Sequence, residues 1–429
     1  MSDLRPRTNR SRTGNGDAST IARHGQLKRR NPFTALAKIL AAALGVVLVS
    51  GVSVAAIAAW DVTSSVHKSV TLVDAKGKAI VPQVGAIDGA FNVLLAGSDS
   101  GDGNAAYGTR GENLNDVTML LHVSADHKNA TVISFPRDMF VAIPSCPDPK
   151  GGSFDAMSYQ KINNTLTYGG LACTVLTVEK LTGLRIPYAG VIQFDGVIEM
   201  SNAVGGVPVC VAGDITDPYT GLNVKAGQNT LQGAQALAFL RTRHGVGDGS
   251  DLGRISNQQV FLSSLVRTIK SADTLANPVK VYALAKAAAS NMSLSESLNN
   301  PTTIASMAIA MKGIDLNKVV FVQYPNHYVA DGVAPTEDAA TALMTALQND
   351  QPVVVTGDTG VGSVTDPNAP AASQTPSSTT APSTAPSSGG SSGSSGGSSG
   401  SGSGSAVDLP SDVHGQTAGQ YTCSKPFSG

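Results

Sequence analysis

A glycine-rich segment of charged residues is the part of the chain best suited to chemistry. Three arginines, Arg241, Arg243 and Arg254, lie along it, together with two aspartates, Asp248 and Asp251. A guanidinium group is a rigid fork of N–H donors, which suits bidentate phosphate recognition better than a lysine does. Carboxylates among such arginines suggest a bridging cation or a proton acceptor. The alternative is a solvent-exposed basic patch whose positive charge is partly balanced by surface carboxylates.

The glycines of this segment favour the phosphate site over the solvated patch. Four glycines occur between Arg243 and Arg254, and an Asn-Gln-Gln run follows at 257–259. Glycine allows the close backbone approach that a phosphate site requires of a loop. Apolar residues recur at helical spacing over 234–240 and again over 255–269. The sequence therefore predicts a loop held between two helices.

Charged residues stand at the ends of three apolar runs. The runs cover 91–97, 119–123 and 130–135, and they are typical of buried strands. The charged residues that adjoin them are Asp99, Asp116, Arg137 and Asp138. Any one of these is more often a turn residue than part of a site. Because ligands of α/β sheets bind at strand ends, their recurrence predicts a shared site.

Helical and extended patterns alternate along the rest of the chain, which indicates an α/β domain. Helices are expected over 174–181, 195–203, 282–289, 303–311 and 338–347, and strands over 188–194, 207–211 and 319–324. The chain has no Walker A sequence, no His-Glu-x-x-His and no Cys-x-x-Cys, which argues against an NTPase or a zinc enzyme. With a formal net charge of -1, the chain has no overall electrostatic attraction to nucleic acid.

Taken in order and spacing, a set of short motifs resembles the LytR-CpsA-Psr family. The motifs are Gly97-Ser98-Asp99-Ser100, Asn115-Asp116-Val117-Thr118, Ser134-Phe135-Pro136-Arg137-Asp138, Lys161-Ile162-Asn163, Val204-Gly205-Gly206-Val207, and the segment from Arg241 to Gln258. The resemblance runs from about residue 90 to about residue 325. It implies an extracellular three-layer α/β domain with a central mixed sheet. Such proteins transfer a glycan from a polyprenyl pyrophosphate carrier to peptidoglycan.

The resemblance also implies roles for individual residues. It places a Mg²⁺ ion on Asp99 and Asp116. It assigns pyrophosphate binding to Arg137, Arg241, Arg243 and Arg254, with Lys161, Gln258 and Asp251 at further polar positions of the site. We therefore expect the catalytic set to be Asp99, Asp116, Arg137, Arg241, Arg243, Asp251 and Arg254. The family commonly has an arginine where this chain has Leu114, and Arg110 is the candidate replacement from the same loop.

Two classes of function remain open at this stage. The first is metal-assisted phosphoryl transfer, in which a peptidoglycan hydroxyl attacks and polyprenyl phosphate leaves. A pyrophosphatase, in which water attacks, would need the same residues. The second class is a non-catalytic wall-binding or regulatory protein that only holds an anionic polymer. Metal-binding carboxylates would repel such a polymer, which favours the enzyme.

The N-terminal region is expected to cross the membrane. Residues 1–38 are basic and read as a disordered cytoplasmic tail, whereas 39–60 carry no charged side chain. The positive-inside bias places the catalytic domain outside the cell, as a single-pass protein of the cell membrane. A cleaved signal peptide is the alternative, but its apolar region is usually about 7–15 residues long. A juxtamembrane segment at 61–88 precedes the catalytic domain, expected at 89–350.

The C-terminal region and the cysteines complete the organisation. Residues 351–407 are expected to form a disordered spacer rich in Ser, Gly, Thr and Pro, and 408–429 a short tail. All four cysteines follow the predicted anchor, and an exported location permits disulfides. We favour a Cys146–Cys173 bridge, which would fasten a loop beside the site. Cys210 and Cys423 are left to pair or to stay free.

An uncleaved anchor makes a testable prediction about topology. A reporter fused after Gly429 should be active only outside the cytoplasm, and the purified protein should keep its N-terminus. Enzyme-reporter activity and N-terminal sequencing would check both. A purified chain that begins near Ala59 would instead identify a cleaved signal peptide.

Overall fold

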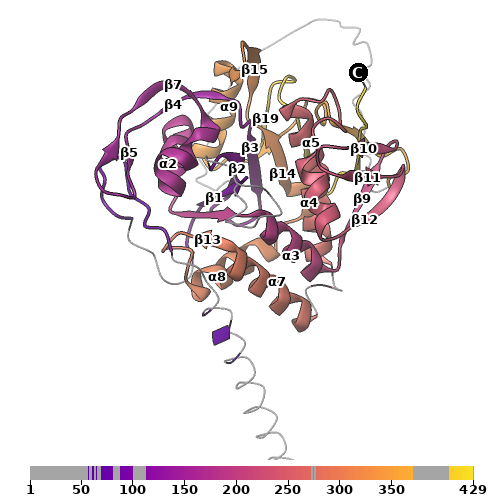
Figure 1. The fold of residues 1–429 in the computed structure, drawn as a ribbon, viewed down its shortest axis with the longest axis horizontal. Helices are drawn as coiled ribbons and strands as arrows, with labels where there is room; N and C mark the ends of the chain where they lie inside the picture. The colour runs from indigo at the N-terminus through magenta and orange to yellow at the C-terminus, as the bar shows by residue number, and fades with distance from the viewer. Residues whose placement is uncertain are drawn as a thin grey trace, which may run out of the picture. The chain divides into compact units, whose positions relative to one another are not determined.

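A seven-stranded mixed sheet lies at the centre of the domain (Figure 1). The computed structural model describes residues 57, 60–61, 64, 69–80, 87–99, 113–271, 274, 277–370 and 405–428. In spatial order the strands are β13 (Met292–Leu294), β8 (Tyr188–Ile192), β1 (Phe91–Ser98), β2 (Asn115–Val123), β3 (Ala130–Phe135), β14 (Val319–Gln323) and β20 (Gly415–Thr417). β1 is parallel to β8 and β3 to β14, whereas the other neighbours are antiparallel. The predicted α/β domain with a central mixed sheet is confirmed.

The helices begin at capping signals that are visible in the sequence. In the described residues they are α2 (Thr165–Thr182), α3 (Phe194–Val204), α4 (Ala234–Arg241), α5 (Asp251–Lys270), α7 (Pro278–Asn291), α8 (Pro301–Lys312) and α9 (Glu337–Gln348). Ser250 caps α5 by accepting a hydrogen bond from the Gly253 amide. Asn277 and Asn300 cap α7 and α8 in the same way, each ahead of a proline. The predicted loop between two helices is confirmed and covers 242–250. The second helix begins four residues earlier than expected, because Ser250 caps it, so Asp251 and Arg254 lie on α5 and not on the loop.

Each central strand alternates its side chains between two hydrophobic cores. In β1, Leu94 and Ala96 join a core with residues of α2 and α9. Phe91 and Val93 join another core, with residues of α5 and α8. This is the period-two alternation of an extended chain. Helices therefore cover both faces of the sheet and produce a three-layer arrangement.

A second sheet, of four strands, incorporates the C-terminal tail. Its order is β12 (Gly227–Leu231), β9 (Val207–Val211), β21 (Thr422–Ser424) and β18 (Ser363–Thr365). Cys423 of β21 pairs with Cys210 of β9, and the two form a disulfide. Leu409 and Val413 of the tail are buried in the main core. The tail is therefore a structural part of the domain.

Short two-stranded ribbons surround the sheet. They pair β4 (Phe140–Ile143) with β7 (Met157–Lys161), β5 (Cys146–Pro147) with β6 (Ser153–Phe154), β10 (Ile215–Asp217) with β11 (Leu222–Val224), β15 (Asn326–Val329) with β16 (Gly332–Pro335), and β17 (Val353–Val354) with β19 (Val407–Asp408). Two of them brace the segment after β3. Ile162 donates to the Met139 carbonyl at 2.9 Å, and Val333 donates to the Asp138 carbonyl at 3.2 Å.

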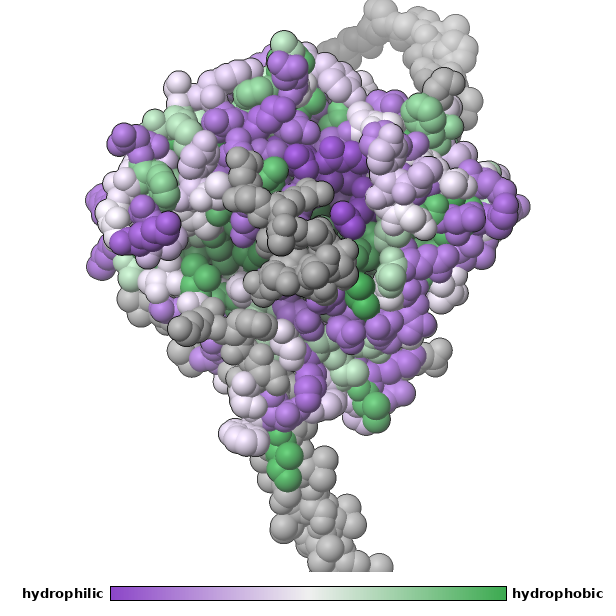
Figure 2. Space-filling model, viewed as in Figure 1, coloured by the Kyte–Doolittle hydropathy of each residue, from purple (hydrophilic) through white to green (hydrophobic). Residues whose placement is uncertain are grey.

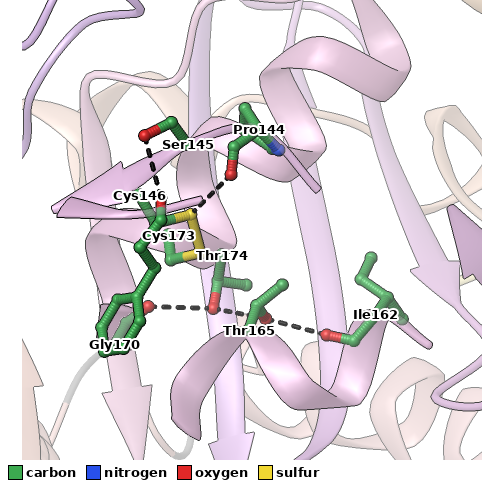
Figure 3. Close-up of a disulfide and its surroundings, with 9 residues drawn as sticks. Pro144, Ser145, Cys146, Ile162, Thr165, Gly170, Cys173 and Thr174 are labelled. Atoms are coloured by element: carbon green, nitrogen blue, oxygen red, sulfur yellow. Dashed lines mark hydrogen bonds between the residues drawn. A yellow bond between two sulfur atoms is a disulfide. The ribbon is translucent and has the colours of Figure 1, made fainter. Parts of the chain in front are cut away.

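The expected Cys146–Cys173 disulfide joins β5 to α2 (Figure 3). A Cβ atom at Gly169 would lie 2.8 Å from the Cys173 Cβ and 2.9 Å from the Cys146 Cβ. Glycine is therefore required where the two cysteines meet. Beside the bridge, the buried hydroxyls of Thr165 and Thr174 lie 2.9 Å apart across the kink in α2 at Gly169 and Gly170. The disulfide fastens the chain that follows the strand-end residues of β3.

The spacer expected over 351–407 begins later than the sequence suggested. Residues 351–370 contain β17 and β18, and the Asp366 amide donates to the Tyr421 carbonyl at 3.0 Å. This part is ordered by pairing with the returning tail, which a scan of local composition does not detect. The most Ser/Gly-rich part, 371–404, lies outside the described residues.

The expected basic tail at 1–38 and the anchor at 39–60 lie almost entirely outside the described residues. In the part that the structure does describe, no helix combines the length and the apolarity needed to cross a bilayer. The juxtamembrane segment is tied to the domain. Val70 donates to the Leu294 carbonyl at 2.9 Å, and Leu72 and Ile80 are buried in the main core. The anchor itself stays a prediction.

Ending the chain at Gly404 should lower its melting temperature. The truncation removes β19, β20 and β21, the core residues Leu409, Val413 and Ala418, and a disulfide whose cysteines are 213 residues apart. Loss of a native disulfide alone typically costs about 2–5 kcal/mol. Calorimetry of the truncated chain, of Cys423→Ser and of the full chain separates tail docking from the covalent bond. Equal melting temperatures for all three would contradict a structural role for the tail.

Candidate active site

The register of the sheet brings the predicted strand-end residues to one edge. β2 is antiparallel to both β1 and β3, and Ser98 lies opposite Asn115. The beginning of β2 therefore lies between the ends of its two neighbours. This arrangement places Asp99, Asp116 and Arg137 at the same edge of the sheet, although long stretches of chain separate them.

Asp116 lies between two arginines. Arg137 Nη1 forms an ion pair with Asp116 Oδ1. Arg254 Nη1 lies 4.0 Å from the other carboxylate oxygen, and Arg254 Nη2 donates to the Asp116 backbone carbonyl at 2.6 Å. The Arg254 side chain is only 4% exposed. A buried cation therefore fastens α5 to the beginning of β2.

Asp251 joins the same network from the first turn of α5. Its Oδ1 lies 2.6 Å from Arg254 Nη2 and 3.5 Å from Arg243 Nη2. Its Oδ2 accepts a hydrogen bond from the Arg137 amide at 3.1 Å. Residues three apart on a helix share a face, so Asp251 can reach Arg254. One carboxylate thus holds groups from the end of β3, from the 242–250 loop and from α5.

Lys161 belongs to the site through Asp138. Lys161 Nζ lies 3.4 Å from Asp138 Oδ1, and Arg137 Nε lies 3.7 Å from Asp138 Oδ2. The Lys161 ammonium also lies 5.6 Å from the centre of the Phe140 ring. The β4–β7 ribbon therefore places the Lys161 ammonium group at the strand ends beside Arg137.

Arg241 and Gln258 approach the site from the helical side. The Arg241 guanidinium lies over the Phe194 ring of α3, 4.2 Å from its centre. Gln258 lies one turn after Arg254 on α5, and its amide donates to the Leu240 carbonyl at 2.9 Å. Both side chains line one cavity with Asp116 and Arg254.

The site carries crowded positive charge. Burial lowers the pKa of Arg243, and the neighbouring charges of Arg254 and Arg137 act in the same direction. Asp251 opposes this shift, and arginine remains protonated near neutral pH. The Nε atoms of Arg137 and Arg254 are buried without a hydrogen-bond partner among the described atoms. Buried donors without partners are costly, so an anion with several oxygens is the ligand that this arrangement favours.

An apolar cavity of about 210 Å³ adjoins the charged residues. The charged edge contributes Asp116, Arg241 and Arg254 to its wall. The remaining lining is mainly aliphatic and aromatic and comes from β1, β2, α3, α4, α5 and α7: Leu95, Val117, Met119, Phe194, Val197, Met200, Leu237, Leu240, Phe261, Leu262, Leu265 and Leu284. The site therefore combines a cationic edge with a hydrophobic cavity.

The two predicted metal ligands suit a hard cation. Asp99 is 2% exposed, and its Oδ1 accepts the Leu114 amide at 2.9 Å. Mg²⁺ commonly binds through one or two carboxylates together with substrate phosphates, and Asp99 and Asp116 adjoin neighbouring strand ends. The buried Asn115 Oδ1, which has no hydrogen-bond partner in the described part of the chain, is a further oxygen at this position. Arg110, the candidate replacement arginine, lies outside the described residues.

The strand-end pattern correctly placed Asp138 at the shared site, but its contacts with Lys161 and Arg137 were not foreseen. Nothing in the sequence indicated the apolar wall of the cavity, because residues such as Val197, Leu237 and Leu262 recur at the spacing of ordinary core residues. Only the packing of four helices against the sheet leaves a cavity between them.

Comparison with known proteins places the chain in a family. A family model described as LytR_cpsA_psr matches residues 56–350. The chain is 33% identical over 266 residues to a probable cell wall biosynthesis protein, LcpB, from Corynebacterium glutamicum, covering 60% of this chain and 61% of that protein. It is 30% identical over 243 residues to the polyisoprenyl-teichoic acid–peptidoglycan teichoic acid transferase TagU from Enterococcus faecalis, covering 56% and 74%.

A solved structure has the same fold. The crystal structure of protein gbs0355 from Streptococcus agalactiae superposes with a TM-score of 0.51 at 22% identity, covering 61% of this chain and 88% of that one. The aligned part spans 61% of the length of LcpB and 51% of the length of LcpA, another Corynebacterium glutamicum cell wall biosynthesis protein. With most of its length matched by the family model, the chain belongs to the LytR-CpsA-Psr family.

Proposed function

We propose that this protein is a phosphotransferase that attaches a polyprenyl-pyrophosphate-linked glycopolymer to peptidoglycan and releases polyprenyl phosphate. The observation that carries the proposal is the apolar cavity whose wall includes Arg241, Arg254 and Asp116. The donor is an apolar chain joined to a pyrophosphate. One such molecule would fill the cavity and place its anionic group among the arginines. The relative named as a teichoic acid transferase supports the same class of reaction.

The reaction requires charge stabilisation more than a protein nucleophile. A peptidoglycan hydroxyl attacks the phosphorus that carries the sugar and loses its proton as the new P–O bond forms. The bond to the bridging oxygen breaks, and polyprenyl phosphate leaves with that electron pair. Arg137, Arg243 and Arg254 supply fixed donors for the charge on the phosphate oxygens. Asp251 positions the guanidinium groups of Arg243 and Arg254 and the backbone of Arg137 before the substrate arrives.

Asp99 and Asp116 are the residues that would hold Mg²⁺. The ion would neutralise pyrophosphate charge when bound. Asp116 also pairs with Arg137, so its carboxylate offsets part of the positive charge of the arginines at the site.

The proposed location is the outer face of the cell membrane, with the N-terminus in the cytoplasm. Two disulfides among the described residues support exposure to an oxidising compartment. A donor that is itself a membrane lipid also requires a site close to the bilayer. A pyrophosphatase would use the same groups with water as acceptor, and a non-catalytic polymer-binding protein would need only the arginines.

Substitutions of the aspartates and of the arginines should have different effects on binding and turnover. Asp116→Ala should abolish turnover but keep lipid pyrophosphate bound, because it removes a proposed metal ligand and frees Arg137. Arg254→Ala should weaken binding and turnover together, with a rate loss of about 3–4 kcal/mol, or roughly 100- to 1,000-fold. Arg243→Lys keeps the charge without the bidentate fork and should fall between wild type and Arg243→Ala. The assay follows polyprenyl phosphate released from a synthetic lipid-linked sugar.

Controls decide between the alternatives. Melting temperatures must be matched, because Arg254 is buried and its loss removes the shorter of the two ion pairs of Asp251. Full activity of Asp116→Ala in a chelator would refute the metal role. Unchanged donor binding by Arg254→Ala would refute the arginine role. Release of polyprenyl phosphate without added peptidoglycan identifies the pyrophosphatase, and polymer binding without any turnover in wild type identifies the non-catalytic protein.

Narrowing the cavity should penalise long donors selectively. Val197→Trp places a large ring on the cavity wall contributed by α3. Burial contributes about 0.8 kcal/mol per methylene, so excluding about two methylenes corresponds to roughly a tenfold loss in kcat/KM. The matched control is a donor with a short, water-soluble chain, whose kcat/KM should change little. An equal loss for both donors would mean that the substitution damages the charged edge instead.

A further inference from the structure

Helix α8 exposes an apolar stripe that its role in the fold does not explain. Ile304, Ile309 and Met311 are 45%, 74% and 37% exposed. Ala305 and Ala308 are exposed on the same stripe, and the helix has no charged residue before Lys312. A helix at the surface of a soluble domain normally presents polar residues to water. An exposed apolar stripe of this kind marks a contact surface.

Helix α7 continues this surface. Val279 and Val281, in its first turn, are 72% and 44% exposed. Lys270 at the end of α5 donates to the carbonyls of Met311 and Lys312, at the end of α8. α7 begins at Pro278, eight residues after Lys270, so the chain leads from the contact with α8 to the first turn of α7. Figure 1 draws α7 and α8 at the lower end of the domain, and Figure 2 shows hydrophobic residues exposed at the tip over α7.

The N-terminal chain reaches the domain at α7. Lys286 Nζ lies 2.6 Å from Asp61 Oδ2, and the Tyr282 hydroxyl also bonds to that carboxylate. Trp60, immediately before Asp61, is 72% exposed. Asp61, the residue that follows the uncharged run 39–60, is therefore held by α7. A bilayer that holds this run would come to the same end of the domain as the exposed apolar residues.

We propose that the α7–α8 face, made of Val279, Val281, Ile304, Ile309 and Met311, rests in the interfacial layer of a phospholipid bilayer. Such an interfacial surface combines buried apolar side chains with lysines at headgroup level. Lys280 and Lys312 adjoin these residues in the chain and would supply those charges for anionic headgroups. The contact orients the domain and does not depend on which reaction the site performs.

The proposed contact has a consequence for lipid entry. Leu284, one turn after Lys280 on α7, lines the apolar cavity beside the charged edge. The helix that contacts the bilayer is then also a wall of that cavity. A polyprenyl chain would reach the cavity along α7 without crossing the aqueous phase.

Fluorescence quenching in vesicles tests the face with the full chain. The sequence has a single tryptophan, Trp60, so Trp60→Phe provides a background for new probes. Ile309→Trp and Val279→Trp place a probe on the α7–α8 face at positions that are 74% and 72% exposed. Tyr328→Trp is the matched control, because Tyr328 is 63% exposed on β15, at the opposite end of the domain in Figure 1. The vesicles contain phosphatidylcholine and phosphatidylglycerol, with or without bromine on the acyl chains.

Brominated lipid should quench both probes on the α7–α8 face and leave Tyr328→Trp unchanged. Wild type reports the anchor separately through Trp60. Quenching of Trp60 without quenching of either probe on the α7–α8 face would overturn the proposal, while still supporting the predicted membrane anchor. Probe emission that changes with protein density in unbrominated vesicles, and not with bromine, would assign the face to a second copy and also overturn it. Absence of protein from the vesicles would reject both the anchor and the face.

Discussion

The active site depends on keeping Arg254 charged while it is nearly excluded from water. A buried guanidinium is costly unless its donors are paired, and here Asp251 and the Asp116 carbonyl provide the partners. These contacts join α5 to the beginning of β2, and Asp251 in turn holds the Arg137 amide at the end of β3. The network that stabilises the cation is therefore the same network that positions the strand ends.

Two environments meet at this edge. The arginines form a cationic region that favours binding of an anion. The adjoining cavity is lined almost entirely by apolar atoms. Fixed charges act more strongly beside a low-dielectric wall than in open water. In the proposed function, a phosphate held there would experience the arginine field with little screening once an apolar chain excluded water from the cavity. Binding of the chain would then strengthen the stabilisation of charge at the phosphate.

The C-terminal tail shows how distant segments complete the scaffold. β20 adds an edge strand to the central sheet, and β21 lies between β9 and β18. The Cys210–Cys423 bond makes this docking covalent, while Cys146–Cys173 fastens the chain after β3. The long Ser/Gly-rich stretch between the two parts of the domain does not prevent their association, because loop-closure entropy grows only slowly with loop length.

The sequence alone determined the α/β class, the loop between α4 and α5, and the residue types able to bind phosphate. These features depend on local periodicity, caps such as Ser250, and side-chain chemistry, which neighbouring residues encode. Only the tertiary structure decided that Asp251 links Arg137 to Arg254, that Asp138 holds Lys161, and that the tail belongs to the domain. Those outcomes depend on strand register and helix packing between residues far apart in the chain. The apolar cavity belongs to the same group, because its lining residues resemble ordinary core residues until the packed helices leave space between them.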